Sequence, residues 1–240
     1  MKALIVAGGR GERLRPLTDT KPKPMVEVAG KPILLHTVEL LRKAGITEFI
    51  FALCYLPEVV KDYFGDGSKF GVSIEYTLED PSFPLGTAGA IKASQQYIAD
   101  TFIVTYADIL RELDVKKMIK LHKDSLAFAT INVYKRFGKD PKSLVRFDEK
   151  KKIEEFIERP SPDEIKENFV WCNGSLYIFE PEIFNYISEN SHSDFGKDIF
   201  PHLLQENKPV YAFQTAGFFI DIGTKEKLQK AEEAFKTISS

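Results

Sequence analysis

The sequence predicts an α/β protein with a mainly parallel, mixed sheet covered by helices on both faces and a small β-rich segment inserted into it. In the first half of the chain, short β-rich runs alternate with amphipathic stretches of helix length, a pattern typical of repeated βαβ units. After residue 134 this rhythm changes, because three strand-like runs follow with no long helix between them. In such a fold, ligands bind beyond the carboxyl ends of the parallel strands.

The expected elements follow this scheme in order. The first half gives strands at 2–7, 48–55, 72–78 and 102–106, with helices at 31–45, 56–65 and 86–98 between them, then a helix at 115–124 and a strand at 126–134. The inserted strands are 142–147, 151–160 and 168–179, with a surface loop from Pro160 through the charged segment DEIKEN. Short β-rich runs and stretches of helix length then alternate again, at 181–188, 194–205, 209–213, 218–223 and 225–236. We predict one domain over 1–240, with parts at 1–133, about 134–180 and 181–240.

Composition excludes several classes of protein. A chain of 240 residues can bury roughly 70–75% of its unfolded surface. Lys+Arg 33 against Asp+Glu 35 gives a net charge of -2, which argues against binding of duplex nucleic acid. No apolar run reaches the ~18 residues of a membrane span, and no secretory signal is recognisable. Two cysteines, with no CxxC pair, favour a cytoplasmic protein with buried thiols.

A glycine-rich loop, AGGRGERLRPLT at 7–18, follows the first predicted strand. Gly8, Gly9 and Gly11 let a ligand approach the main chain closely, as a phosphate-binding turn requires. The loop is no dinucleotide fingerprint, because Leu14 stands where GxGxxG needs its third glycine, and the GK[ST] of a P-loop is also missing. An ordinary glycine turn with solvated arginines is the alternative.

Cations surround this loop. Arg13 and Arg15 supply planar donors suited to phosphate, and Lys21 and Lys23 follow in a proline-stiffened KPKP segment. Several cations at one site favour a polyanion with several phosphates. We therefore expect a nucleoside triphosphate as the ligand.

The ordered motifs of the chain resemble one known family. After the glycine loop and KPKPMVEVAGKPIL come six blocks in the family's order, namely PLGTAGA at 84–90, TYAD at 105–108, ERP at 158–160, NGSLYIF at 173–179, DFGKDIFP at 194–201 and FIDIGT at 219–224. Together they resemble the sugar-1-phosphate nucleotidyltransferases, or nucleotide-sugar pyrophosphorylases, over nearly the whole chain. The resemblance implies a Rossmann-like α/β/α sandwich with an inserted sugar-binding part. At this length, it implies the short form without a C-terminal β-helix.

The resemblance also implies a reaction. A sugar 1-phosphate oxygen would attack the α-phosphorus of a nucleoside triphosphate, giving a nucleotide-sugar and pyrophosphate, with Mg²⁺ as the cofactor. Such a transfer needs positioning and charge neutralisation more than covalent help from the protein. The implied catalytic residues are Arg13, Lys23 and Asp108, and the implied metal ligands are Asp108 and Asp221. The implied nucleotide-binding residues are Ala7, Gly8, Gly9, Gly11, Glu79, Gly86 and Thr87.

The implied sugar-phosphate site consists of Glu158, Arg159, Asn173 and Gly174. Glu158 would bind hydroxyls and Arg159 the phosphate. Two positions depart from the family pattern, since Arg159 replaces a common lysine and Tyr106 precedes the metal aspartate where smaller residues are frequent. We expect Tyr106 either to narrow the pocket or to point into the core.

Other functions stay open on the sequence alone. A non-catalytic regulatory relative is disfavoured because Arg13, Lys23, Asp108 and Asp221 are all present, and a non-sugar phosphate acceptor is disfavoured by the hydroxyl-binding side chains. Guanylyl transfer to mannose 1-phosphate or a related sugar phosphate is our preferred interpretation. Uridylyl, thymidylyl and cytidylyl transfer are the alternatives, and the sequence does not decide whether copies of the chain form a homo-oligomer.

Overall fold

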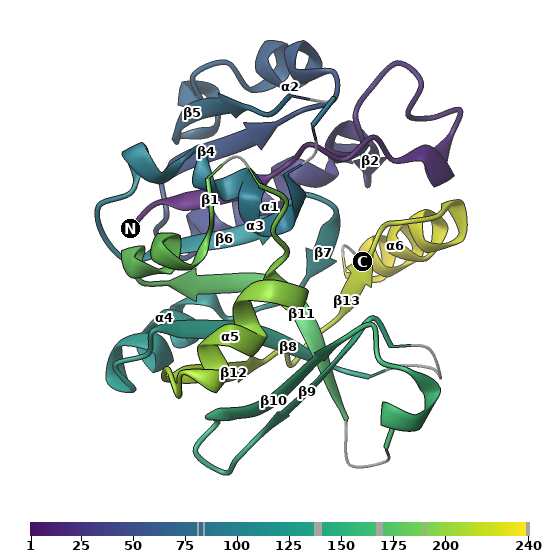
Figure 1. Ribbon diagram of the computed structural model, residues 1–240. Helices are drawn as coiled ribbons and strands as arrows, with labels where there is room; N and C mark the ends of the chain where they lie inside the picture. The colour runs from purple at the N-terminus through teal and green to yellow at the C-terminus, as the bar shows by residue number, and fades with distance from the viewer. Residues whose placement is uncertain (81, 84, 137–140, 167–169, 190, 239–240) are drawn as a thin grey trace.

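A nine-stranded mixed sheet forms the centre of the protein (Figure 1). Its structure is a computed structural model that describes residues 1–80, 82–83, 85–136, 141–166, 170–189 and 191–238. The sheet order is β10-β9-β11-β6-β1-β4-β5, and β8 pairs with β11 and β12 off this path. This arrangement confirms the predicted fold class.

Four parallel strands make the first half of the sheet. They are β1 (Ala3–Val6), β4 (Glu48–Leu53), β5 (Ser73–Leu78) and β6 (Phe102–Tyr106). β1 pairs with β4 on one side and β6 on the other, and β5 pairs with β4. Because all four run in one direction, the segments after their carboxyl ends converge on one edge of the sheet.

The second half of the sheet is mixed and carries the predicted insertion. Its strands are β8 (Ala129–Lys135), β9 (Ser143–Phe147), β10 (Ile153–Glu158), β11 (Trp171–Phe179) and β12 (Val210–Gln214). β11 runs antiparallel to β6, β8 and β9, and β12 runs parallel to β8. β9 and β10 form an antiparallel hairpin at the lower edge of Figure 1. Residues 167–169, which end the predicted surface loop, lie outside the described part of the chain.

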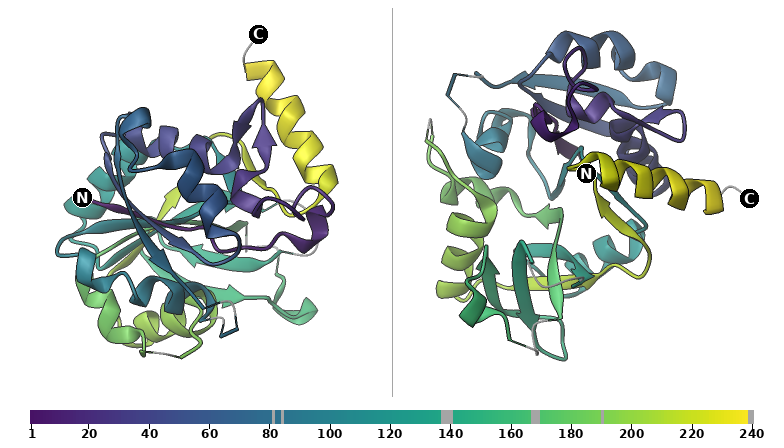
Figure 2. Two further views of the ribbon diagram at one scale, coloured as in Figure 1. Left: turned by 90° about the horizontal axis from the view of Figure 1, so that it is seen from above. Right: turned by 90° about the vertical axis from the view of Figure 1, so that its right-hand side faces the viewer.

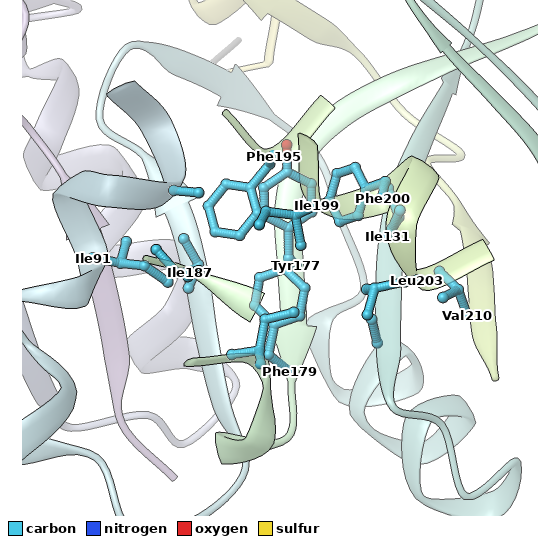
Figure 3. Close-up of a cluster of buried hydrophobic side chains, with 14 of the residues drawn as sticks. Ile91, Ile131, Tyr177, Phe179, Ile187, Phe195, Ile199, Phe200, Leu203 and Val210 are labelled. Carbon is cyan, nitrogen blue, oxygen red and sulfur yellow. The ribbon is translucent and has the colours of Figure 1, made fainter. Parts of the chain in front are cut away.

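Helices cover both faces of the sheet because its central strands are apolar along most of their length and successive side chains point to opposite faces. On one face, Ala3 and Ile5 pack with α1 (Ile33–Lys43), α2 (Pro57–Phe64) and α4 (Val115–Asp124). On the other, Leu4 packs with α3 (Gly86–Lys92) and α5 (Phe200–Gln205). Figure 3 shows Tyr177 and Phe179 of β11 at the centre of this second cluster, beneath Phe195 and Phe200.

A smaller unit closes the edge where the parallel strands end. β13 (Phe219–Asp221) pairs with β7 (Ile109–Arg111), and β2 (Glu27–Val28) pairs with β3 (Lys31–Pro32). The last helix, α6 (Lys225–Ile238), lies beside β2, and the Ala29 amide donates to the Glu232 carboxylate at 3.1 Å (Figure 2). This unit holds the chain end against the loop that follows β1.

Short turns replace some predicted regular elements. The segment 181–188 forms a 3₁₀ helix at Pro181–Tyr186, and the predicted helix at 86–98 divides into α3 and a 3₁₀ turn at Gln95–Tyr97. The predicted strand at 218–223 joins the small ribbon with β7 instead of the main sheet. Within the described ranges, no helix combines the length and the hydropathy needed to cross a bilayer.

Candidate active site

The glycine loop leaves β1 at the edge where the parallel strands end. A Cβ on Gly8 would lie 2.8 Å from the Cβ of Cys54, and a Cβ on Gly11, whose φ is 69°, would lie 2.9 Å from the Cβ of Lys23. Both positions therefore require glycine. Ala7 is buried and its amide donates to Ala52, whereas the amides of Gly8, Gly9 and Gly11 donate no hydrogen bond within the described part of the chain. Free amides in a turn are a suitable cradle for an anion.

Lys23 lies directly beneath this loop. It begins a short 3₁₀ helix, Lys23–Met25, and is only 9% exposed. Its amide approaches the Gly9 carbonyl at 3.4 Å, and its Nζ forms an ion pair with Asp108. Lys23 thus holds its ammonium group in a fixed position next to the glycine loop. Its ion-pair partner, Asp108, is one of the predicted metal ligands.

The arginines of the loop diverge. Arg13 reaches the other side of the site, where its Nη2 lies 3.1 Å from the position that a Cβ on Gly223 would occupy. Arg15 pairs with Asp19 at 3.4 Å on the exposed surface. Only Arg13 therefore lies near the end of β13.

Asp108 and Asp221 meet at this edge from distant parts of the chain. Asp108 follows β6 and Asp221 ends β13, and the Ile222 amide donates to the Asp108 carbonyl at 2.9 Å. Both side chains line a cavity of about 600 Å³. Burial disfavours the charge of Asp221, but the hydrogen bond and charge of Lys142, with Lys23 and Lys227 farther away, outweigh it and lower its pKa.

These two carboxylates fit Mg²⁺. No group of three or more histidine, cysteine, aspartate or glutamate side chains within the described residues could hold a metal ion. Mg²⁺ in substrate complexes commonly uses one or two protein carboxylates, with waters and phosphate oxygens as its other ligands. Asp108 and Asp221 supply that donor set.

Aromatic side chains form one wall of the cavity. Tyr134 of β8 stacks on Phe219 of β13, with ring centroids 3.9 Å apart. Tyr106 also lines the cavity, and its ring packs edge-on against Tyr177 with centroids 6.2 Å apart. Tyr106 therefore both borders the cavity and packs against the buried cluster around Tyr177, so it meets both expectations from the sequence.

Glu158 lines the same cavity and ends β10. Gly196 makes room for it, because a Cβ on Gly196 would lie 2.5 Å from Glu158 Oε2. Burial, followed by the charge of Asp194, raises the pKa of Glu158 to about 7, against the opposing charges of Arg159, Lys142 and Lys197. This carboxyl group is partly protonated near neutral pH, so it can both donate and accept hydrogen bonds.

Asn173 and Gly174 have different positions. Asn173 lines the cavity, but its side chain is engaged within the protein, since Nδ2 donates to the Tyr177 hydroxyl at 2.8 Å and Oδ1 accepts from the Ser175 amide at 2.9 Å. Gly174 is buried and is not among the cavity-lining residues, and a Cβ there would lie 2.2 Å from Asn132 Oδ1. Its lack of a side chain serves strand packing.

Two other predicted residues lie away from the cavity wall. Gly86 has a φ of 76° and contacts the segment before α5, because a Cβ there would lie 2.5 Å from the Ser193 carbonyl oxygen. Its neighbour Thr87 does line the cavity and donates to Asp194 at 2.9 Å. Arg159 is exposed and lies outside the lining of the cavity. Pro84, the first residue of the PLGTAGA block, lies outside the described residues.

Glu79 borders a second cavity, of about 430 Å³, between the end of β5 and α3. It follows β5, and its amide donates to the Leu53 carbonyl at 2.8 Å. Burial raises the pKa of Glu79, and its buried Oε1 has no hydrogen-bond partner. Cys54 lies close to both the glycine loop and Glu79, because it contacts Gly8 and the charge of Glu79 helps burial to raise the pKa of its thiol. A buried acceptor without a protein donor can accept a hydrogen bond from a ligand with N–H donors.

The family model described as nucleotidyl transferase matches residues 2–237. The chain belongs to the nucleotidyl transferase family. This confirms the family that the ordered motifs indicated.

Relatives and solved structures of this family align with most of the chain. A UTP–glucose-1-phosphate uridylyltransferase of Synechocystis is 37% identical over 93% of this chain and 60% of its own length. A mannose-1-phosphate guanyltransferase of Debaryomyces hansenii is 36% identical over 93% of this chain and 61% of its own length. The chain therefore spans about 60% of the length of these curated relatives. The structure of HddC from Yersinia pseudotuberculosis complexed with GMP-PN is 30% identical with a TM-score of 0.78, covering 98% of this chain and 99% of that one.

The nucleotidyl transferase site also contains residues that sequence reasoning missed. Beyond the predicted set, the large cavity is lined by Tyr134, Lys142, Phe219, Lys227 and Lys230. Lys142, which precedes β9, and Lys227 and Lys230 of α6 belong to no ordered motif. Lys142 and Lys227 come together because the β9–β10 hairpin and α6 both face Asp221. The FIDIGT block contains Phe219 and could have indicated it.

Proposed function

We propose that this protein transfers a nucleotidyl group from a nucleoside triphosphate to a sugar 1-phosphate, releasing pyrophosphate and requiring Mg²⁺. The observation that carries this proposal is the convergence of Asp108, Asp221 and Lys23 beside free glycine amides, at the mouth of a cavity of about 600 Å³. A phosphate cradle on one side and a hydroxyl-binding cavity on the other suit two substrates that react between them.

In this reaction an oxygen of the sugar phosphate forms a bond to the α-phosphorus, and the bond from the α-phosphorus to the oxygen that bridges the α- and β-phosphates breaks. The glycine amides and Arg13 bind the β- and γ-phosphates that leave. Lys23 is nearly buried and so keeps its position, where it neutralises charge on the α-phosphate. Mg²⁺, held by Asp108 and Asp221, would add charge neutralisation at the reacting phosphates.

The acceptor is held in the cavity between β8, β10 and β11. Glu158, whose pKa burial raises to about 7, hydrogen-bonds sugar hydroxyls, and the Tyr134–Phe219 stack supplies an apolar surface for a sugar ring face. The mixture of polar tips and aromatic faces favours a sugar over a choline-like cation, for which an aromatic cage would be expected.

We further propose that the base is guanine. Guanine presents two adjacent donors on one edge, N1–H and N2–H₂, whereas uracil and thymine present one N–H between two carbonyl oxygens. A carboxylate accepts both donors of guanine at once, and Glu79 supplies a buried carboxylate oxygen with no partner. The guanyltransferase relative and the HddC complex with GMP-PN support the same choice. We accordingly propose mannose 1-phosphate or a related sugar phosphate as the acceptor.

A cytoplasmic location follows from this proposal, since nucleoside triphosphates are cytoplasmic substrates. Both cysteines, Cys54 and Cys172, are free thiols, which agrees with a reducing compartment.

A panel assay tests the proposed function. The protein is incubated with Mg²⁺, each of GTP, UTP, CTP, ATP and dTTP, and mannose 1-phosphate or other sugar 1-phosphates, and pyrophosphate release is measured. We expect the highest rate with GTP. Release with UTP or dTTP alone would overturn the guanine assignment, and no release with any pair would overturn the enzymatic function.

A further inference from the structure

Lys142 occupies a position in the large cavity that no motif assigns. It precedes β9, lines the cavity, and its Nζ forms an ion pair with Asp221. Its side chain is 65% exposed, whereas that of Asp221 is 15% exposed. The ammonium group therefore reaches from the hairpin across the cavity mouth to the carboxylate on β13.

Arg159, the residue expected to bind the sugar phosphate, has a different placement. Its φ is 50°, it is exposed, and it lies outside the lining of the cavity. Its amide donates to the Lys142 carbonyl at 2.8 Å, so the two residues are backbone neighbours across the hairpin. Of these two cationic side chains, only that of Lys142 borders the cavity.

Lys142 also stands between the two ends of the acceptor site. Its charge acts on Asp221 on the metal side and on Glu158 on the hydroxyl side. A sugar 1-phosphate with hydroxyls at Glu158 must place its phosphate toward Asp108 and Asp221, where it attacks. Lys227 and Lys230 of α6 also line the cavity, but Lys142 is the lining lysine whose charge acts on both Asp221 and Glu158.

We propose that Lys142 binds the phosphate of the sugar 1-phosphate and exchanges its pairing with Asp221 for that phosphate when the acceptor enters. The inference rests on the proposed function, because it takes the acceptor to be a sugar 1-phosphate. The Lys142 ammonium group can leave Asp221 without disturbing the core, because the Lys142 side chain is 65% exposed. Lys227 lies 3.8 Å from Asp221 and continues to neutralise it after the exchange.

The test compares Lys142→Met, Lys142→Arg and Arg159→Met with a matched control, Lys150→Met. Lys150 is exposed in the turn between β9 and β10 and lies outside the cavity lining. The KM for mannose 1-phosphate and the KM for GTP are measured separately, and thermal unfolding checks that each variant folds.

We expect Lys142→Met to raise the KM for mannose 1-phosphate by roughly tenfold to a hundredfold, the effect of losing one charge-assisted hydrogen bond. The KM for GTP stays within about twofold, Lys142→Arg recovers part of the loss because it keeps the charge, and Lys150→Met behaves as the unmodified protein. A rise in KM for mannose 1-phosphate with Arg159→Met, and none with Lys142→Met, would overturn the inference. So would a change confined to GTP or to the Mg²⁺ requirement, which indicates that Lys142 only neutralises Asp221.

Calorimetric binding of mannose 1-phosphate separates this inference from the proposed function. If the unmodified protein binds mannose 1-phosphate but releases no pyrophosphate, weaker binding by Lys142→Met would still support the inference while the proposed reaction fails. Equal binding by both proteins would overturn the inference whatever the outcome of the turnover assay.

Discussion

Replacement of Glu79 by glutamine should change which nucleotide the protein prefers. The carboxylate offers two acceptors to the N1–H and N2–H₂ donors of guanine, and its Oε1 is buried without a protein partner. Glutamine has nearly the same shape but replaces one acceptor with an NH₂ donor, so one hydrogen bond is lost and two donors face each other. Such a mismatch at a buried site costs about 1–3 kcal/mol. At about 1.4 kcal/mol per factor of ten, kcat/KM for GTP should fall by roughly 5- to 150-fold.

The same substitution should leave UTP unaffected or improve it, because a carboxamide can accept from the single N–H of uracil and donate to a neighbouring carbonyl. The assay is pyrophosphate release with GTP and UTP as competing donors, reported as the ratio of kcat/KM values. Glu75→Gln is the matched control, since Glu75 lies on β5, the strand that Glu79 follows, but is exposed and outside the second cavity. An unchanged ratio of GTP to UTP in Glu79→Gln would refute the assignment of Glu79 as the base-reading residue.

The other predictions concern catalysis, metal and stability. Asp108→Asn or Lys23→Ala should lower kcat by about 10²–10³, the scale of losing one preorganised electrostatic contact. Near-normal rates in both variants would show that the active site has been assigned to the wrong residues. Treatment with EDTA should abolish pyrophosphate release and added Mg²⁺ should restore it, whereas unaffected release would exclude a metal requirement. Gly174→Ala should lower the free energy of unfolding by about 1–3 kcal/mol in urea titrations, because its Cβ would lie 2.2 Å from Asn132 Oδ1. Glu158 has an ordinary pKa of 4.5 and a pKa of about 7 in the folded protein, so the folded state binds more protons between these values and the free energy of unfolding should fall as pH rises through this range. Glu158→Gln should make the free energy of unfolding less dependent on pH in this range. An equally steep pH dependence in the variant would show that other groups cause it.

The sequence could predict those parts of the site that depend on local patterns. The glycine loop is recognisable because Gly8 and Gly11 sit after an apolar strand, and both prove to be close-approach positions. Asp108 could be placed at the sheet edge because it follows a strand of the parallel sheet. Asp221 ends β13, which pairs antiparallel with β7 outside the main sheet, so the two aspartates could be paired only through the family resemblance.

Tertiary packing decided what the sequence could not. Gly86 was expected to make room for a nucleoside, yet the space beside it is occupied by the Ser193 carbonyl, a contact between residues more than a hundred positions apart. Gly174 likewise makes room for Asn132. In a single sequence, a glycine that admits a ligand and one that admits another segment of chain look alike.

The different placement of the Lys142 and Arg159 side chains has a similar cause. Both residues carry a positive charge at neighbouring positions of one hairpin, and a family motif favoured Arg159. The left-handed backbone of Arg159 and the register of β9 with β10 determine which side chain borders the cavity. Neither feature has a signature in residue order alone.

Isotope transfer tests the central claim most directly. Mannose 1-phosphate labelled with ¹⁸O in its phosphate group is incubated with GTP, Mg²⁺ and the protein, and the products are analysed by mass spectrometry. Because the sugar phosphate attacks the α-phosphorus, all of the label should appear in the nucleotide-sugar and none in pyrophosphate. Label in pyrophosphate, or the absence of a labelled nucleotide-sugar, would contradict nucleotidyl transfer at this site.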